Sequence, residues 1–151
     1  MKTRVLHIND LCVTRQPVVY TCFGLGSCIA LFVVDRLSGI TGGVHIPLPD
    51  TIGPGEFLSA ARLIETLLGN FEKLGSNLFY LKAKMAGGAQ VYESAVNLGR
   101  QNIDSVVTHL ATRKIFLAAS DVGGRLARTA HFNSVTGALT IFTSEQKTYT
   151  I

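Results

Sequence analysis

Short apolar runs alternate with turn residues over the first 50 positions, and this pattern predicts β-strands. The apolar, β-branched runs are Val18–Cys22, Ile29–Val34 and Ile40–Leu48. Asp35–Gly39 has the length of a hairpin connection. Pro47 ends the third run, because proline cannot donate a hydrogen bond to a strand ladder. This part of the chain therefore predicts strands joined by tight turns.

One later segment carries a clear helical period. Apolar residues recur every three or four positions from Glu56 to Leu74, which predicts an amphipathic helix with one buried stripe. Gly75 follows where a C-terminal cap belongs. A shorter helix is predicted over Asn102–Ala111, with Asn102 as its N-cap. The stripe of the first helix consists of Phe57, Ala60, Ala61, Ile64, Leu67, Leu68, Phe71 and Leu74.

Further strands complete the pattern. They are predicted at Leu78–Met85, Lys114–Ala119, Arg128–Phe132 and Ala138–Thr143. Asn133–Gly137 is a second hairpin-length turn, and such turns favour antiparallel pairing. Two helices against about eight strands predict an α+β layered fold, not an alternating βαβ one. No repeat or linker interrupts the chain, so we expect a single domain over residues 1–151.

Composition narrows the class of protein. A chain of 151 residues is long enough to bury a core without a disulfide or a metal. With 47% hydrophobic and 16% charged residues, a disordered chain or a coiled coil is excluded. The net charge of +4 comes from lysines and arginines scattered singly. This pattern argues against a nucleic-acid partner, whereas an acidic protein surface would be attracted.

The compartment is also predicted from the sequence. Gln16–Val34 is uncharged and long enough to raise the question of a membrane span. The break at Gly24–Ser27 divides it into two β-branched arms, so two buried strands around a turn fit better and no membrane insertion is expected. Met1–Asp10 lacks the apolar region of a secretory signal. The three cysteines have no paired spacing, which is typical of reduced thiols in a soluble cytoplasmic protein.

Familiar cofactor sites are absent from the sequence. Gly24-Leu25-Gly26 is followed by Ile29 where a dinucleotide-binding motif needs its third glycine. No Gly-Lys-Ser or Gly-Lys-Thr is present, which excludes a P-loop. The cysteines lack the spacing of zinc ligands. We therefore expect neither a cofactor nor a metal.

The glycine turn before Cys28 is the strongest candidate for chemistry. Backbone without side chains lets a large substrate approach the thiol, and the amides of Gly26 and Ser27 could face a developing oxyanion. A reactive cysteine needs a base within hydrogen-bond reach. Taken alone, a cysteine beside an apolar strand is more often a small buried hydrophobe, so both interpretations stay open.

Four histidines could supply the base, and His45 differs from the others. Gly42 and Gly43 precede it and Pro47 follows, which sets an imidazole near the end of a strand on rigid backbone. A structural role for His45 stays open from these residues alone. Of the other histidines, His109 falls beside the apolar face of the second predicted helix, as a partly exposed residue, and nothing distinctive surrounds His7 and His131.

Several motifs taken together resemble one family. The sequence Gly24-Leu25-Gly26-Ser27-Cys28 and an apolar strand are followed by His45-x-x-Leu48-Pro49, Ala86-Gly87-Gly88-Ala89, Asp121-x-Gly123-Gly124 with Arg128, and Asn133-x-x-Thr136-Gly137. In this order, and over nearly the whole chain, the sequence resembles CheD, the chemoreceptor glutamine deamidases of bacterial chemotaxis.

The resemblance implies a cysteine hydrolase that converts glutamine side chains of methyl-accepting chemotaxis receptors to glutamate and releases ammonia. Cys28 would be the nucleophile and His45 the base, with a thioester intermediate. The implied fold is a sandwich of layered sheets with helices on one side. The implied partners are the receptors and a CheC-type phosphatase that competes for the deamidase.

One position departs from the family pattern. The family places a threonine six residues before its cysteine, where this chain has Cys22, and Thr21 lies one residue earlier. Neighbours on a strand point to opposite faces, so the two cannot do the same job. A bulge near Phe23 would restore Thr21 as the third catalytic residue, which is the expectation here. Otherwise Cys22 takes the position.

Two other functions compete with the deamidase. The departure at Cys22 favours a catalytically weak adaptor that binds receptors or CheC, whereas the presence of Cys28 beside His45 argues against it. A papain-like peptidase is the more distant alternative. Its signature around the cysteine is absent, and the chain is short for that fold.

Overall fold

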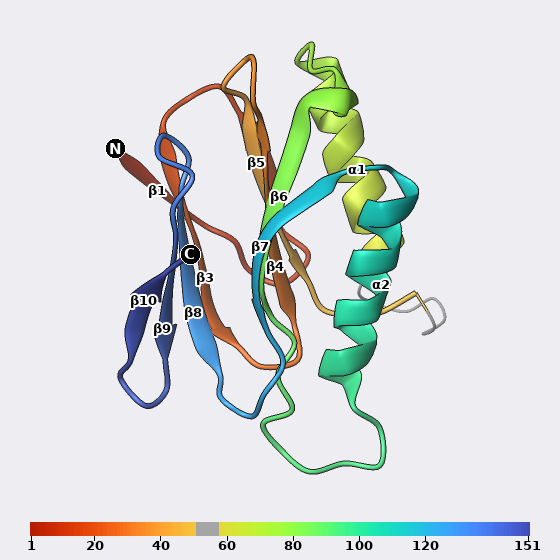
Figure 1. Ribbon diagram of the computed structural model, residues 1–151, viewed down its shortest axis with the longest axis vertical. Helices are drawn as coiled ribbons and strands as arrows, with labels where there is room; N and C mark the ends of the chain where they lie inside the picture. The colour runs from red at the N-terminus through yellow and green to blue at the C-terminus, as the bar shows by residue number, and fades with distance from the viewer. Residues whose placement is uncertain (51–57) are drawn as a thin grey trace.

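A computed structural model describes residues 1–50 and 58–151, which form three layers (Figure 1). Sheet A has the strand order β1 (Lys2–Val5), β3 (Val18–Leu25), β8 (Arg128–Asn133), β9 (Leu139–Thr143), β10 (Thr148–Thr150). Sheet B has the order β2 (Leu11–Thr14), β5 (Thr41–Ile46), β4 (Ile29–Asp35), β6 (Leu81–Gly87), β7 (Phe116–Val122). Helices α1 (Ala60–Lys73) and α2 (Leu98–Thr112) cover the outer face of sheet B. The α+β layered class is confirmed.

Most strand pairs are antiparallel, as the hairpin-length turns predicted. Asp35–Gly39 joins β4 to β5, and Asn133–Gly137 joins β8 to β9. Two pairs are parallel, β1 with β3 and β6 with β7. The partners of these parallel pairs are not joined by a tight turn, so turn length gave no signal for them.

The apolar stripe of α1 packs as predicted, and the helix ends at the expected glycine. Gly75 has a positive φ of 98°. Its N–H donates to the Glu72 carbonyl at 2.9 Å, and the next N–H, of Ser76, donates to the Phe71 carbonyl at 3.0 Å. These two bonds form a Schellman cap. The predicted start of the helix at Glu56 and Phe57 lies outside the described residues.

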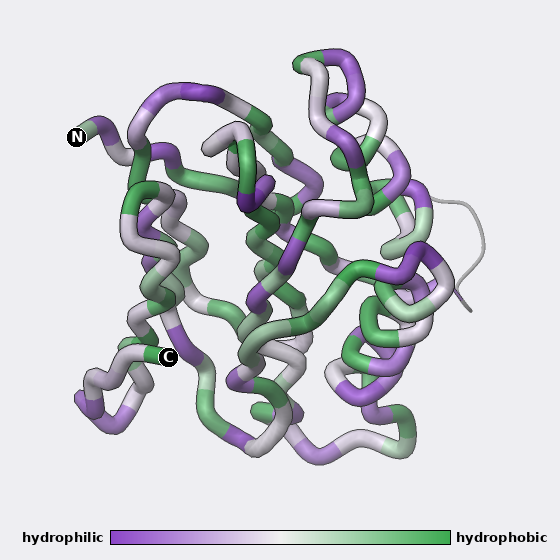
Figure 2. The backbone as a smooth tube through the Cα atoms, turned by 45° about the horizontal axis from the view of Figure 1, so that its top comes forward, coloured by the Kyte–Doolittle hydropathy of each residue, from purple (hydrophilic) through white to green (hydrophobic). Residues whose placement is uncertain are grey.

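Strand β4 is buried on both faces, which explains its continuous apolar run. Ile29, Leu31 and Val33 pack towards the helices, and Ala30 and Phe32 pack towards sheet A. There the ring of Phe32 stacks on Phe132 of β8, with 5.0 Å between centroids. Figure 2 shows the central strands as mostly hydrophobic, whereas hydrophobic and hydrophilic residues alternate along the helices. Two hydrophobic cores thus share one strand.

The second helix begins earlier than predicted. Asn97 is its N-cap, and the Asn97 side chain accepts a hydrogen bond from the Arg100 N–H at 3.0 Å. The prediction of Asn102 as the cap is therefore wrong. Both asparagines precede apolar residues, but Asn102 lies one turn inside the helix, where its side chain is fully buried.

The remaining differences concern strand ends and weakly patterned strands. Leu78–Tyr80 is a short 3-10 helix, so β6 begins at Leu81. Strand β7 begins at Phe116, later than predicted, and β5 ends at Ile46. The sequence pattern missed β1, β2 and β10, whose residues are all exposed or only half-buried.

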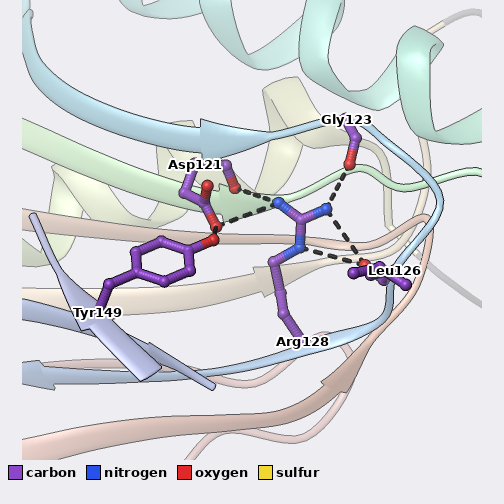
Figure 3. A network of polar contacts seen from close by, with 5 residues as sticks. All are labelled: Asp121, Gly123, Leu126, Arg128 and Tyr149. Atoms are coloured by element: carbon purple, nitrogen blue, oxygen red, sulfur yellow. Dashed lines mark hydrogen bonds and ion pairs between the residues drawn. The ribbon is translucent and has the colours of Figure 1, made fainter. Parts of the chain in front are cut away.

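A polar network around Arg128 joins the two sheets at one edge (Figure 3). The guanidinium is 7% exposed. It donates to the Asp121 carbonyl at 2.8 Å and the Asp121 carboxylate at 3.2 Å, and also to the carbonyls of Gly123 and Leu126. The Tyr149 hydroxyl donates to the same carboxylate at 2.8 Å. Strands β8 and β10 of sheet A are thereby tied to β7 of sheet B.

We expect Arg128→Leu to lower the free energy of unfolding by about 3 kcal/mol, because it leaves the half-buried Asp121 carboxylate without its ion-pair partner and three carbonyls without the guanidinium donor. Urea denaturation measures this change. The matched control is Arg100→Leu, which removes an exposed pair with Asp104 on α2 and should change stability by less than about 0.5 kcal/mol. Equal losses in the two variants would contradict a structural role for the network.

Candidate active site

The candidate nucleophile lies in the turn between β3 and β4. Strand β3 ends at Leu25 after a register shift against β8, and β4 begins at Ile29. Gly24 has a positive φ of 59°, which favours glycine. Cys28 follows as a free, half-buried thiol. The glycine turn therefore presents the thiol at the end of the sandwich.

Backbone hydrogen bonds from the end of β6 hold this turn. The Gly88 N–H donates to the Cys28 carbonyl at 2.9 Å, and the Ala89 N–H donates to the Gly26 carbonyl at 2.8 Å. Gly87 has a φ of 115°, and a Cβ there would lie 2.1 Å from the Cys28 carbonyl oxygen. Only glycine fits at 87, so the Gly-Gly pair serves the close approach of two backbones.

The Arg128 network is linked to the nucleophile turn through this same segment. The Gly123 N–H donates to the Gly87 carbonyl, and the Gln90 N–H donates to the Gly124 carbonyl, both at 2.9 Å. Arg128 holds the Gly123 carbonyl from the other side. The glycine motifs noted in the sequence thus form one continuous support for Cys28.

His45 lies on β5 with its ring between the two sheets. It pairs with Ala30 of β4, whose side chain faces sheet A, and it is 5% exposed. Its Nδ1 lies 2.9 Å from the Leu6 carbonyl oxygen. A carbonyl only accepts hydrogen bonds, so Nδ1 carries the proton and the neutral ring keeps a lone pair on Nε2. The contact fixes the tautomer that a general base needs.

Strand register brings Cys28 and His45 to one face of sheet B. Cys28 precedes Ala30 by two residues and packs on the same cluster between the sheets. Because His45 lies opposite Ala30, the thiol and the imidazole are diagonal neighbours, a relation within reach of long side chains. The register therefore places both candidate residues on the same face, at one end of the ladder between β4 and β5.

Burial keeps both groups neutral. Desolvation raises the pKa of the Cys28 thiol, and a hydrogen bond from its own backbone N–H offsets part of this effect. Desolvation lowers the pKa of the His45 imidazole, against the opposing effects of the Leu6 carbonyl and the Asp10 carboxylate. Both shifts favour the neutral forms, a thiol and a neutral imidazole, which suit proton transfer from the thiol during attack.

The structure does not bring the Thr21 side chain to this pair. Cys22 belongs to the cluster between the sheets, so Thr21 faces the outer side of sheet A, opposite His131. The register shift lies between Cys22 and Leu25, beyond Thr21, and leaves it on that side. Its hydroxyl is buried without a hydrogen-bond partner in the described part of the chain. Burial raises the pKa of the Cys22 thiol to about 12.

Thr21 supports the position of the His45 ring through its backbone instead. Its carbonyl accepts the Leu6 N–H at 2.8 Å, and the carbonyl of Leu6 accepts the proton of His45 Nδ1. The backbone of Leu6 is thus hydrogen-bonded to β3 through its N–H and to the His45 imidazole through its carbonyl. Sequence reasoning missed Leu6, since a backbone carbonyl leaves no signal in residue type.

A groove of about 480 Å³ opens beside the nucleophile turn. Gly26 and Ser27 line one wall, and Val91, Tyr92 and Val96 line the other. Tyr92 is 84% exposed. Within residues 1–50 and 58–151, no hydrogen-bond acceptor is found for the backbone N–H groups of Gly26 and Ser27. These two amides are the candidates for binding an oxyanion.

Metal chemistry has no candidate site in the described residues, where no group of three or more His, Cys, Asp or Glu side chains is gathered. In the same part of the chain, neither helix is long and apolar enough to cross a membrane.

Asn102 is a second residue near the site that sequence reasoning missed. Its side-chain Nδ2 donates to the Ser27 carbonyl at 2.8 Å and to the Pro47 carbonyl at 3.1 Å. The available signal was an amide on the buried face of a helix, next to the core residues Ile103 and Val106.

Comparison with known proteins identifies the family. The CheD family, described as acting in chemotactic sensory transduction, matches residues 53–143. The chemoreceptor glutamine deamidase CheD of Thermotoga maritima is 36% identical over 143 residues, covering 91% of this chain and 90% of that protein. The chemoreceptor glutamine deamidase CheD of Halalkalibacterium halodurans is 37% identical over 147 residues, covering 91% of each chain. The chain with the Cys28 turn and the buried His45 belongs to the CheD family.

Proposed function

We propose that this protein is a chemoreceptor glutamine deamidase that works through a Cys28–His45 pair. Family membership supports receptor glutamines as the substrate. The observation that carries the catalytic assignment is the shared face of the two residues, with His45 Nδ1 hydrogen-bonded to the Leu6 carbonyl. This leaves Nε2 as the base.

The first half of the reaction forms a thioester. His45 Nε2 takes the thiol proton as Cys28 Sγ attacks the carboxamide carbon of a glutamine side chain. The oxyanion is bound by the backbone N–H groups of Gly26 and Ser27, which line the groove. The protonated imidazole then gives its proton to the leaving nitrogen, and ammonia departs as the C–N bond breaks.

The second half releases glutamate. Neutral His45 takes a proton from water as the water oxygen attacks the thioester carbon, and the C–S bond breaks. The sulfur regains a proton from the imidazolium, so the enzyme returns to its neutral pair. The net reaction consumes one water and releases one ammonia for each glutamine. No cofactor or metal takes part in the proposal.

The proposal includes a CheC-type phosphatase as a second partner and a cytoplasmic location, where the modified segments of receptors lie. Both rest on the resemblance to the family. Adding a CheC protein to a deamidation reaction should slow it in proportion to complex formation. Unchanged rates at saturating CheC would remove this partner from the proposal.

The decisive experiment is mass spectrometry of a glutamine-rich cytoplasmic receptor fragment after incubation in heavy-oxygen water. The proposal expects glutamine-to-glutamate conversion, with one heavy oxygen in each new carboxylate, and the Cys28→Ala variant as the inactive control. Binding without glutamine conversion across several receptors would contradict the deamidase and favour the alternative, an adaptor that binds receptors.

Thr21→Val tests whether the Thr21 side chain is the third catalytic residue. Since the hydroxyl of Thr21 is buried and has no hydrogen-bond partner among the described residues, we expect deamidation within about twofold of the wild type and a gain in stability of about 1 kcal/mol. The backbone carbonyl that supports Leu6 is unchanged by this substitution. Steady-state kinetics and urea denaturation measure the two quantities. A loss above about tenfold in the rate would show that the side chain, and not the backbone, takes part.

A further inference from the structure

A single buried amide spans the two strands that carry the proposed nucleophile and base. Asn102 of α2 is fully buried. Its Nδ2 donates to the carbonyl of Ser27, which directly precedes Cys28, and to that of Pro47, two residues after His45. Both partners are carbonyls and only accept, so the orientation of the amide follows from its surroundings and both N–H groups are used.

The amide acts at the point where the ladder between β4 and β5 stops. The last pair is Ile29 with Ile46, and the next would be Cys28 with Pro47. The Cys28 carbonyl faces β6, where it accepts the Gly88 N–H, so Cys28 makes no ladder bond to Pro47. Asn102 supplies the missing link from the helix layer. Gly88 and Ala89 hold the same turn from β6, and Asn102 holds it from α2.

Helix packing alone does not account for an asparagine at this position. The neighbouring residues Ile103 and Val106 belong to the hydrophobic core. The Oδ1 of Asn102 is buried without a hydrogen-bond partner among the described residues. An apolar side chain would fill the space without a stranded oxygen. What the amide adds is the pair of bonds to Ser27 and Pro47.

We propose that Asn102 is a positioning residue that fixes the distance between Cys28 and His45, an inference that rests on the proposed function. Displacing a reacting atom by about 1 Å can slow an enzyme about 100-fold. Asn102 is buried behind the turn, not in the groove, so its loss should lower kcat and leave KM unchanged.

The test compares Asn102→Ala and Asn102→Asp with the matched control Asn97→Ala. Asn97 caps the same helix by accepting the Arg100 N–H and makes no hydrogen bond to Ser27 or Pro47. Both Asn102 variants should lose about 10-fold to 100-fold in kcat, with KM within about twofold. Asn97→Ala should lower the melting temperature and keep kcat within about twofold. Wild-type kcat in folded Asn102→Ala, or equal losses in Asn97→Ala, would overturn the proposal.

The aspartate variant adds a pH signature that a purely structural role would not produce. An ionised carboxylate cannot donate to two carbonyls, but burial raises the pKa of such a carboxyl, and its protonated form donates one bond. The kcat ratio of Asn102→Asp to wild type should therefore rise on acidification, while the ratio for Asn102→Ala stays flat. Parallel profiles for the two variants would contradict positioning by hydrogen bonds.

A readout that needs no substrate separates this inference from the proposed function. Alkylation of Cys28 by iodoacetamide, followed peptide by peptide, reports the burial and mobility of the turn. It should be several-fold faster in Asn102→Ala and unchanged in Asn97→Ala. If the wild type deamidates no receptor while this difference holds, the function fails and the positioning stands. Unchanged alkylation in Asn102→Ala would overturn the positioning.

Discussion

Cys28→Ala should abolish receptor deamidation, with a loss on the order of 10⁴-fold or more, while the protein stays folded. The substitution removes only one sulfur from a half-buried position, and the backbone bonds of Gly88 and Ala89 that hold the turn are untouched. Without the thiol no thioester forms, and a neutral imidazole alone does not activate the glutamine carboxamide for attack by water. Quantitative mass spectrometry of the receptor fragment measures the rate.

Cys12→Ala is the matched control, because Cys12 is also a half-buried free thiol and lies on β2. It should keep the wild-type rate within about twofold. Both variants should bind the receptor fragment as the wild type does. Substantial residual conversion by Cys28→Ala would remove the nucleophile from the proposal, and loss of rate in both variants would point to unfolding.

The elements best predicted from the sequence were those with a buried face. Strand β4 is apolar from position 29 to 34 because cores lie on both of its sides, and α1 shows its stripe because one side packs on sheet B. Gly75 marks the end of α1 because a left-handed residue closes the cap. In each case one local physical requirement limits the residue type, so the element can be predicted from the sequence pattern without knowledge of the fold.

Exposed strands held mainly by backbone pairing were not predictable in the same way. Strand β1 has the sequence Lys-Thr-Arg-Val and β10 has Thr-Tyr-Thr, mostly exposed. Their strand conformation comes from ladder bonds to β3 and β9, which any residue but proline can make. The β1–β3 pair also matters for the site, since Leu6 directly follows β1 and accepts the hydrogen bond of His45.

The residues of the candidate site also differ in how far the sequence predicts them. The glycine and proline surroundings made Cys28 and His45 candidates, the family resemblance supplied their roles, and register accounts for their shared face. The alternation of strand neighbours separated Thr21 from Cys22. The register shift lies between Cys22 and Leu25, where a bulge near Phe23 was predicted, but it leaves Thr21 on the outer side of sheet A. Asn102 was mistaken for a cap, because an asparagine near a helix start serves equally well at two positions until burial separates them.

His45→Gln should lower kcat by about 10²-fold to 10⁴-fold, the usual contribution of a general base. Glutamine keeps a side-chain N–H that can donate to the Leu6 carbonyl, so the packing between β5 and the end of β1 is largely preserved. It cannot accept the thiol proton at neutral pH, and burial already raises the pKa of Cys28. Few thiolates are then present to attack. Initial deamidation rates across a pH series measure the effect.

The pH profile gives this prediction its sharpest form. Only the neutral imidazole accepts a proton, so wild-type kcat/KM should fall on acidification through a pKa below the ordinary histidine value of about 6.5, because burial lowers the pKa of His45. His45→Gln should lose this acid limb, and its residual rate should climb in alkali as the Cys28 thiolate forms. The control, His131→Gln on β8, should keep the wild-type profile. An acid limb that survives in His45→Gln would mean that another group is the base.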